Sequence, residues 1–456
     1  MRRSLVHRCV VLLLPAAAAL AIGCPPPHPQ GAIVAPATDG RLVPLESLTV
    51  SYEAGGVHVI QRITHANDVV AAHLYLLGGA RQLTPTTAGI EALLLEASEH
   101  GTREYPGAAL RHAAARTGSE FVVHPEPDWT LFAFRGITEE FDSSWAILAS
   151  RLMHPSLDDV SVALARSHLV GALRAERNTP DGHLFRLADS VTAAGHPYAL
   201  APSGTEQSLG TITPATLRQY ADSQIVTSRM LLVVVGDVPR ARVEHAVSRT
   251  LGTLPRGHYR WTLPPVLPST STTVLAEERE LPTNYLLGYF RGPPASSEDY
   301  APFRVATELL GARLHQTIRE EHSLTYAAYA PFVDHAATMG GMYVTTIAPD
   351  RVIPLMLDEV RGLQEGWVTR DGLQQFIDQF IVDYYVDNET NAAQADFLAR
   401  AQLYRGDYRR AAATLESLRH VRSEDVRRVA RVYMRDIHFV YLGDTTAVLR
   451  RELERF

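Results

Sequence analysis

The chain repeats its own pattern at an interval of roughly 210 residues, which is the scale of a whole domain. Residues 231–237 read Leu-Leu-Val-Val-Val-Gly-Asp, and residues 438–444 read His-Phe-Val-Tyr-Leu-Gly-Asp. Both runs have the composition of a short buried strand, and both end at Gly-Asp. Self-similarity over so long a period predicts two homologous halves with the same fold.

Further elements recur around these two strands in the same order. Apolar strands are predicted at 71–77 and 285–290, and each is followed by a loop with Gly or Pro and then a long helix. A helix is also predicted ahead of each Gly-Asp strand, one from Pro214 and one from Ser423. Strands mixed with long helices predict an α+β chain of two homologous sandwich domains, each a mixed sheet covered by helices.

Residues 254–272 are rich in proline and are predicted to be a linker. The N-terminal domain is therefore expected at 47–253 and the C-terminal domain at 273–456. The formal net charge is −7, so no basic surface indicates nucleic-acid binding. The absence of lysine excludes a Walker-type phosphate loop and a Schiff-base mechanism.

The first 23 residues have the layout of a signal peptide. Arginines precede an apolar run, residues 9–23, that is too short to span a bilayer comfortably. The run ends in Leu-Ala-Ile-Gly-Cys, which resembles a bacterial lipobox with Cys24 as the acylated residue, and residues 24–46 follow as a tether. We expect a lipid-anchored, periplasm-facing protein of the cell envelope, at the outer membrane because Pro25 replaces aspartate. A plain secretory signal is the alternative.

Residues 89–102 carry the most specific motif, Gly-Ile-Glu-Ala-Leu-Leu-Leu-Glu-Ala-Ser-Glu-His-Gly-Thr. The frame resembles the active-site helix of pitrilysin/insulinase-type (mitochondrial processing peptidase-like) zinc metallopeptidases. In that family, Gly-Leu-x-His-x-x-Glu-His-x-x-x-x-Gly-Thr places two zinc ligands and a general base on one helical face. The resemblance covers about residues 47–456, and it implies that the two domains form a clamshell around a closed chamber.

The ligand positions of that motif are lost. Ala92, Leu95 and Glu96 stand where the family has His, Glu and His. The family's third ligand, a glutamate, corresponds to Ala172. Catalytic zinc needs three protein ligands and an open water position, and neither alanine nor leucine can bind a metal or accept a proton. We therefore expect no zinc and no other cofactor in this chain.

A metal site displaced by one helical turn is the alternative. Glu96, Glu99 and His100 form a Glu-x-x-Glu-His run, and Glu176 lies at the family's spacing from His100. Zinc tolerates one histidine with two carboxylates. Otherwise these are exposed polar residues at a helix end, since Gly101 follows directly.

The second half retains one element of the family's chemistry. Residues 319–326 read Arg-Glu-Glu-His-Ser-Leu-Thr-Tyr. By resemblance, Arg319 and Tyr326 match a pair that binds the substrate backbone and supports the tetrahedral intermediate, and both side chains can donate to an oxyanion. The alternative is an arginine in a salt bridge with Glu320 or Glu321, next to a half-buried tyrosine.

The resemblance implies a role for such a chain, because several bacterial family members are heterodimers in which one subunit carries His-x-x-Glu-His and the other only the Arg/Tyr pair. We expect the non-zinc subunit of an envelope metallopeptidase, inactive alone. Its partners would be a homologous zinc-bearing subunit and an unstructured peptide added to a sheet edge. The alternatives are a non-catalytic scaffold or peptide-binding lipoprotein of the same fold, and a self-sufficient peptidase with the displaced metal site.

Overall fold

The computed structural model of the chain describes residues 48–268, 270–366 and 368–456. Contacts group residues 45–456 into one compact unit. The predicted signal peptide, the lipidation site at Cys24 and the tether lie outside the described residues. Within the described ranges, no helix is both long and apolar enough to cross a bilayer.

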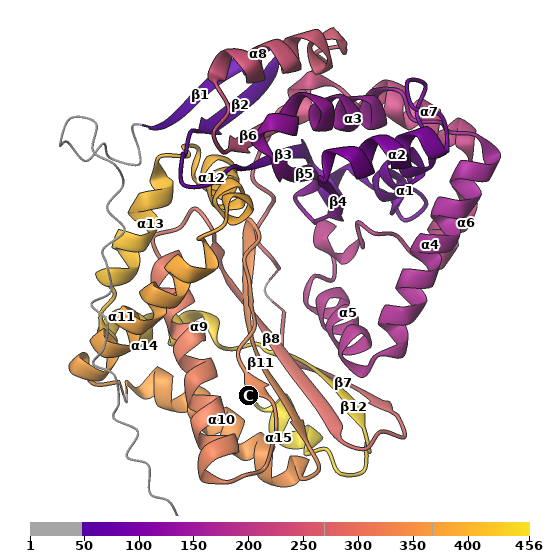
Figure 1. The fold of residues 1–456 in the computed structure, drawn as a ribbon. Helices are drawn as coiled ribbons and strands as arrows, with labels where there is room; N and C mark the ends of the chain where they lie inside the picture. Colours follow the sequence, from indigo (N-terminus) through magenta and orange to yellow (C-terminus); the bar gives the residue numbers. More distant parts are fainter. Residues whose placement is uncertain (1–47, 269, 367) are drawn as a thin grey trace, which may run out of the picture. The chain divides into compact units, whose positions relative to one another are not determined.

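The first half contains a six-stranded mixed sheet (Figure 1). In spatial order, its strands are β1 (Thr49–Ala54), β2 (Val57–Arg62), β6 (Met230–Val235), β3 (Val69–Leu77), β5 (Trp129–Ile137) and β4 (Glu120–Pro125). Strands β2 and β6 are parallel, and all other neighbours are antiparallel. The apolar strand β6 is buried along its whole length, as expected of a central strand with both faces covered.

Helices of the first half other than α5 (Pro180–Thr192) cover one face of this sheet. Their bounds are α1 (Ile90–Ala97), α2 (Ala108–Thr117), α3 (Phe141–Met153), α4 (Asp159–Asn178), α6 (Glu206–Thr211), α7 (Pro214–Gln224) and α8 (Arg240–Arg249). Short 3₁₀ turns are η2 (Gly79–Gln82), η3 (Ser98–His100), η4 (Thr138–Glu140), η5 (Pro197–Ala199), η6 (Thr227–Arg229) and η7 (Leu251–Thr253). Alternate side chains of β3 point to opposite faces, so Leu74 joins the core with Leu94 and Trp145, whereas Tyr75 belongs to a different cluster.

The second half contains a second six-stranded mixed sheet. Its strands are β10 (Phe332–Val333), β11 (Ala337–Thr346), β8 (Asn284–Pro294), β12 (His438–Gly443) and β7 (Thr273–Glu278) in spatial order, and β9 (Ala328–Tyr329) pairs with β11. Its helices are α9 (Tyr300–Leu314), the π-helical η8 (His315–Glu321), α10 (Pro349–Glu365), α11 (Arg370–Asp387), α12 (Asn391–Arg405), α13 (Arg410–Arg419), α14 (Ser423–Tyr433) and α15 (Arg450–Glu454).

The two sheets confirm the predicted fold class and the internal repeat. Strand β6 is parallel to β2 and antiparallel to β3, and β12 is parallel to β7 and antiparallel to β8. Gly236 and Gly443 follow or end these strands with φ of 149° and 142°. A Cβ at Gly236 would lie 2.8 Å from the Val69 carbonyl oxygen, and one at Gly443 would clash with the Asn284 amide. The Gly-Asp motif therefore meets the same steric requirement in both halves.

The other predicted elements are also present, with one difference in length. Strands β3 and β8 contain the predicted runs, and α7 and α14 begin at Pro214 and Ser423. The helix after β8 is long, as expected, but α1 has only eight residues. It ends early because Ser98 turns its hydroxyl back to the Leu95 carbonyl and Gly101 has a φ of 148°.

Equivalent helices are exchanged between the two halves, as Figure 1 shows for α5 and α12. Both helices begin after a capping threonine, Thr179 and Thr390, and these caps are 211 residues apart. Helix α5 packs on β8 and β12 of the second sheet, and α12 packs on β3 and β6 of the first. Each half thus covers the outer face of the other half's sheet, and neither apolar face could be buried alone.

Candidate functional site

The predicted zinc-motif helix is α1, and two of its motif positions lie in the protein interior. Ala92 is 3% exposed, and Leu95 is fully buried in the core of the first half. A methyl group and an isobutyl group have no lone pair for a metal and no basic atom for a water proton. At these positions α1 contributes to packing.

Glu96, the third motif position, pairs with His168 of α4. Ala172, which corresponds to the family's third ligand, lies one turn further along α4 and is exposed. In the family motif, the histidine is on the motif helix and the glutamate on the later helix. Here the carboxylate, Glu96, is on α1 and the histidine, His168, is on α4. Sequence reasoning missed His168, although its spacing of four residues from Ala172 places both on one helical face.

The displaced metal site consists of Glu96, Glu99, His100 and Glu176, and its three glutamates have different partners. Glu99 lies 3.6 Å from an arginine, Arg151, and Glu176 pairs with Arg186 at 2.6 Å. Across the described part of the chain, no group of three or more His, Cys, Asp or Glu side chains is close enough to hold a metal ion. These side chains therefore do not converge on a point where a metal ion could bind.

Arg319 and Tyr326 lie close together in sequence at the end of α9. Arg319 is on the π-helical turn η8, and Tyr326 precedes β9 by two residues. The segment between them is fixed by backbone bonds, from Leu324 to the Ile318 carbonyl at 2.9 Å and from Ser323 to the Arg319 carbonyl at 3.2 Å. The local fold thus presents both side chains from one short, ordered connection.

Both functional groups are available to a ligand. The side chain of Tyr326 is 91% exposed. Arg319 Nη1 lies 3.5 Å from His315 Nε2, and within the described residues Arg319 forms no ion pair with a carboxylate. Arg319 therefore makes no salt bridge with Glu320 or Glu321, and Tyr326 is not half-buried, so the structural alternative for this pair is wrong. A guanidinium and a phenol in this state can donate to an anionic oxygen.

A cavity of about 600 Å³ lies where the two halves meet. Glu176, Arg186 and Asp189 line it from the first half, and Tyr289 and His335 line it from the second. Burial and the negative charge of Glu176 raise the pKa of Asp189 to about 7, against the effect of Arg186. Burial lowers the pKa of His335. The cavity could accept a side chain of a bound peptide.

The chain is similar to one family profile and to several curated proteins. Residues 211–380 match the family profile described as the peptidase M16 inactive domain. The chain is 23% identical over 407 residues to subunit 1 of the mitochondrial cytochrome b-c1 complex of Caenorhabditis elegans, covering 83% of this chain and 84% of the relative. It is 21% identical over 279 residues to the uncharacterized zinc protease YmxG of Bacillus subtilis, covering 60% and 68%. It is 20% identical over 278 residues to the β subunit of the mitochondrial processing peptidase of Blastocladiella emersonii, covering 60% and 58%.

Solved structures of related proteins have the same fold as this chain. A peptidase M16 inactive domain from Pseudomonas fluorescens superposes with a TM-score of 0.79 at 17% identity, over 88% of this chain and 99% of that one. A protease from Helicobacter pylori superposes with a TM-score of 0.78 at 16% identity, over 87% and 99%. The chain thus matches the M16 inactive-domain profile over residues 211–380, its relatives include zinc proteases, and it has the fold of M16, or pitrilysin/insulinase-type, proteins. Its motif helix carries Ala92, Leu95 and Glu96 in place of the zinc-binding set.

Proposed function

We propose that this chain is the non-zinc subunit of a heterodimeric envelope metallopeptidase. A homologous partner with His-x-x-Glu-His would supply the zinc, and this chain would supply Arg319 and Tyr326. The observation that carries the proposal is that neither side chain is engaged by a carboxylate within the described residues and that Tyr326 is 91% exposed. Donors that are already paired inside a protein could not turn to a substrate oxyanion without losing those bonds.

The relatives support a role within an assembly. One is by name a subunit of a processing peptidase, and another is by name a subunit of the cytochrome b-c1 complex. We infer that this chain also works with a partner subunit. Its substrate would be an unstructured peptide, bound in extended form by main-chain hydrogen bonds to a sheet edge.

We infer the location of the protein from its N-terminal sequence. Acylation of Cys24 would attach the protein to the cell envelope, facing the periplasm, and Pro25 favours the outer membrane. An anchored, periplasm-facing chain would meet the unfolded peptides of that compartment.

A non-catalytic scaffold or peptide-binding lipoprotein is the second candidate, and one comparison favours it. The match to the cytochrome b-c1 subunit covers 84% of that relative, whereas the match to the processing peptidase subunit covers 58%. The self-sufficient peptidase with a displaced metal site receives no such support, because Glu99 and Glu176 face arginines.

Native purification followed by identification of the co-purifying chains tests the proposal. A co-purifying homologue with His-x-x-Glu-His, and peptidase activity that requires both chains, is the expected result. An assembly without such a homologue, with no peptidase activity, would favour the scaffold.

A further inference from the structure

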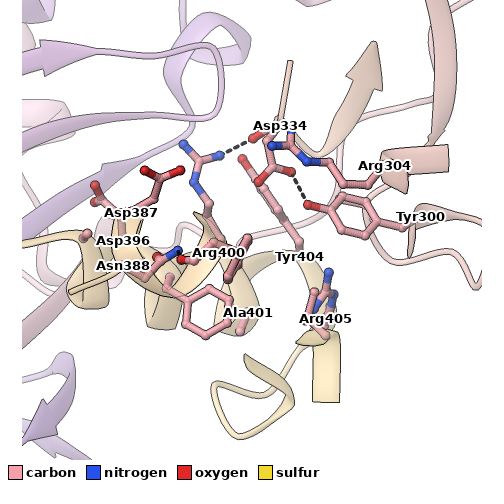
Figure 2. A pocket seen from close by; sticks show the side chains of 15 residues that line it. Tyr300, Arg304, Asp334, Asp387, Asn388, Asp396, Arg400, Ala401, Tyr404 and Arg405 are labelled. Carbon is pink, nitrogen blue, oxygen red and sulfur yellow. Dashed lines mark hydrogen bonds between the residues drawn. The ribbon is translucent and has the colours of Figure 1, made fainter. Parts of the chain in front are cut away.

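A second cavity, of about 290 Å³, lies within the second half between α9, α11 and α12 (Figure 2). In the internal repeat, α11 and α12 correspond to α4 and α5, which line the cavity between the halves. Asp387 in α11 stands 211 residues after Glu176 in α4, the same offset as the two capping threonines. The repeat therefore provides two related cavities, and neither Arg319 nor Tyr326 lines the second one.

The cations of this second cavity are only partly neutralised. Arg304 pairs with Glu308 at 2.7 Å. The Arg400 guanidinium donates to the main-chain oxygen of Asp334 and lies 5.4 Å from the Trp129 ring centroid. The Arg405 guanidinium lies 4.9 Å from the Tyr300 ring centroid.

Within the described residues, neither Arg400 nor Arg405 forms a close ion pair with a carboxylate, although the nearby charges of Asp334, Asp396 and Glu126 stabilise the Arg400 cation. Both side chains are half-buried, where a cation is stabilised less by water than at an open surface. Two such guanidinium groups beside a cavity favour a ligand with a carboxylate, which accepts two charge-assisted hydrogen bonds.

Two of the three carboxylates that line the cavity already have partners. One Asp396 oxygen accepts from the Tyr75 hydroxyl and lies 3.1 Å from His73 Nδ1, and Asp334 accepts from the Tyr300 hydroxyl at 2.9 Å.

Asp387, the third, is exposed at the end of α11, and across the described ranges its carboxylate forms no hydrogen bond or ion pair. In Figure 2, Asp387 lies on one side of Arg400, and Arg304 and Arg405 lie on the other. The cavity thus presents the unpaired Asp387 carboxylate and the Arg405 guanidinium on different sides of Arg400.

Aromatic rings also line the cavity. Tyr384 and Phe397 lie edge to face with centroids 5.7 Å apart, and Tyr404 lines the same cavity. Such rings accept an apolar side chain with little loss of conformational freedom. The volume lies near the lower limit of ligand pockets, roughly 300 Å³, so the occupant must be small.

We propose that this cavity binds a free amino acid with an apolar side chain. Its carboxylate is held by Arg405, its ammonium group by Asp387, and its side chain lies against Tyr384 and Phe397. The site needs no zinc and no partner subunit, so a test of amino-acid binding is independent of the peptidase proposal.

Isothermal titration calorimetry on the purified full chain tests the site. Phenylalanine and leucine should bind with one-to-one stoichiometry, and 3-phenylpropionate, which lacks the ammonium group, should bind more weakly than phenylalanine. Arg405→Gln should weaken both aromatic ligands about tenfold or more, because it removes a charged donor. Asp387→Asn should weaken phenylalanine by a similar factor and leave 3-phenylpropionate unchanged.

Two exposed residues elsewhere provide the matched controls. Arg451→Gln and Asp222→Asn make the same chemical changes away from the cavity and should leave binding unaltered. Arg405→Lys keeps the charge and should retain part of the affinity, which separates loss of binding from loss of fold. The proposal is overturned if none of the twenty amino acids binds at millimolar concentration, if Asp387→Asn affects both ligands alike, or if inorganic phosphate competes as well as phenylalanine.

Discussion

The carboxylate of Asp128, in the first half, accepts a hydrogen bond from the hydroxyl of Tyr404, in the second half, at 2.8 Å. Asp128 is fully buried, and it also accepts from the Tyr198 hydroxyl at 2.6 Å and from the Ala336 amide at 2.9 Å. A buried carboxylate costs free energy unless its lone pairs are satisfied, and these donors come from both halves. The network therefore couples the docking of α12 to the folding of the first sheet.

Loss of this network should destabilise the whole chain. Tyr404→Phe removes one hydrogen bond to a charged group and should lower the free energy of unfolding by about 1–3 kcal/mol. Asp128→Ala should cost more, because three buried donors then lose their acceptor. Urea unfolding measures both changes, with Tyr385→Phe as the control, since that ring is 54% exposed. A midpoint for Asp128→Ala equal to that of the wild type would contradict the assignment.

The degenerate zinc motif gives a second prediction. Glu96 and His168 supply only two metal-binding side chains, and Leu95 fills the position of the base. We expect the isolated chain to contain less than stoichiometric zinc after dialysis, as measured by elemental analysis. Leu95→Glu, which restores one motif residue, should lower the thermal midpoint, because it buries an unpaired carboxylate in an apolar core. One zinc per chain that disappears in His100→Ala would establish the displaced site instead.

The sequence predicts the repeated strands well because their signals are local. Runs such as residues 231–237 are apolar, short and closed by a glycine that the backbone requires. The exchange of α5 and α12 could not be predicted in this way. It depends on contacts such as that between His73 and Asp396, which are 323 residues apart. Hydrophobic periodicity shows that a helix or strand has an apolar face, but it does not show which element packs against that face.

For the candidate site, too, the sequence predicts the local motifs but not the contacts between them. The motif frame located α1, but the pairing of Glu96 with His168 requires the spatial contact between α1 and α4. The π-helical turn that carries Arg319 also has no sequence signal of its own, since it continues the apolar pattern of α9. Residue types were therefore predictable, and their mutual orientation was not.

The cavity between the halves should make stability depend on pH through Asp189. Its pKa is raised to about 7 by burial and by Glu176, whereas an aspartate in an unfolded chain has a pKa of roughly 3.9. Between these values the folded chain holds a proton that the unfolded chain has released, so stability falls as the pH rises from about 4 to 7. Water reaches Asp189 inside the cavity, so we expect a modest effect.

Asp189→Asn should remove this dependence. Thermal midpoints of the variant and the wild type should agree near pH 4 and diverge by pH 8, where the variant is the more stable. Asp222→Asn serves as the control, because that carboxylate does not line the cavity. Parallel pH profiles for Asp189→Asn and the wild type would show that the folded protein does not perturb this group.

The proposed membrane anchor can be tested by fractionation. If Cys24 is acylated, Cys24→Ser should move the protein from the membrane to the soluble fraction, because stable anchoring requires two or more acyl chains. The variant should retain the thermal midpoint of residues 48–456, since the substitution lies outside the described fold. A variant that stays with the membrane would rule out the lipid as the anchor.

The last prediction concerns Arg319 and Tyr326 in a complex reconstituted with a zinc-bearing partner. Tyr326→Phe removes one hydroxyl donor and keeps the ring, and because the side chain is 91% exposed, packing should hardly change. Loss of one oxyanion donor typically lowers kcat by about 10²–10³-fold. Arg319→Ala should do at least as much harm, because it removes a charged donor as well.

Tyr385→Phe and Arg451→Gln make comparable changes at other exposed positions and should leave kcat unaltered. The subunit dissociation constant should stay the same in all four variants, because the two residues are proposed to face the substrate and not the partner. Measured together, kcat and this constant separate a catalytic role from a role in assembly. If kcat is unchanged in both Tyr326→Phe and Arg319→Ala, the pair has no catalytic role, and the chain is better explained as a scaffold.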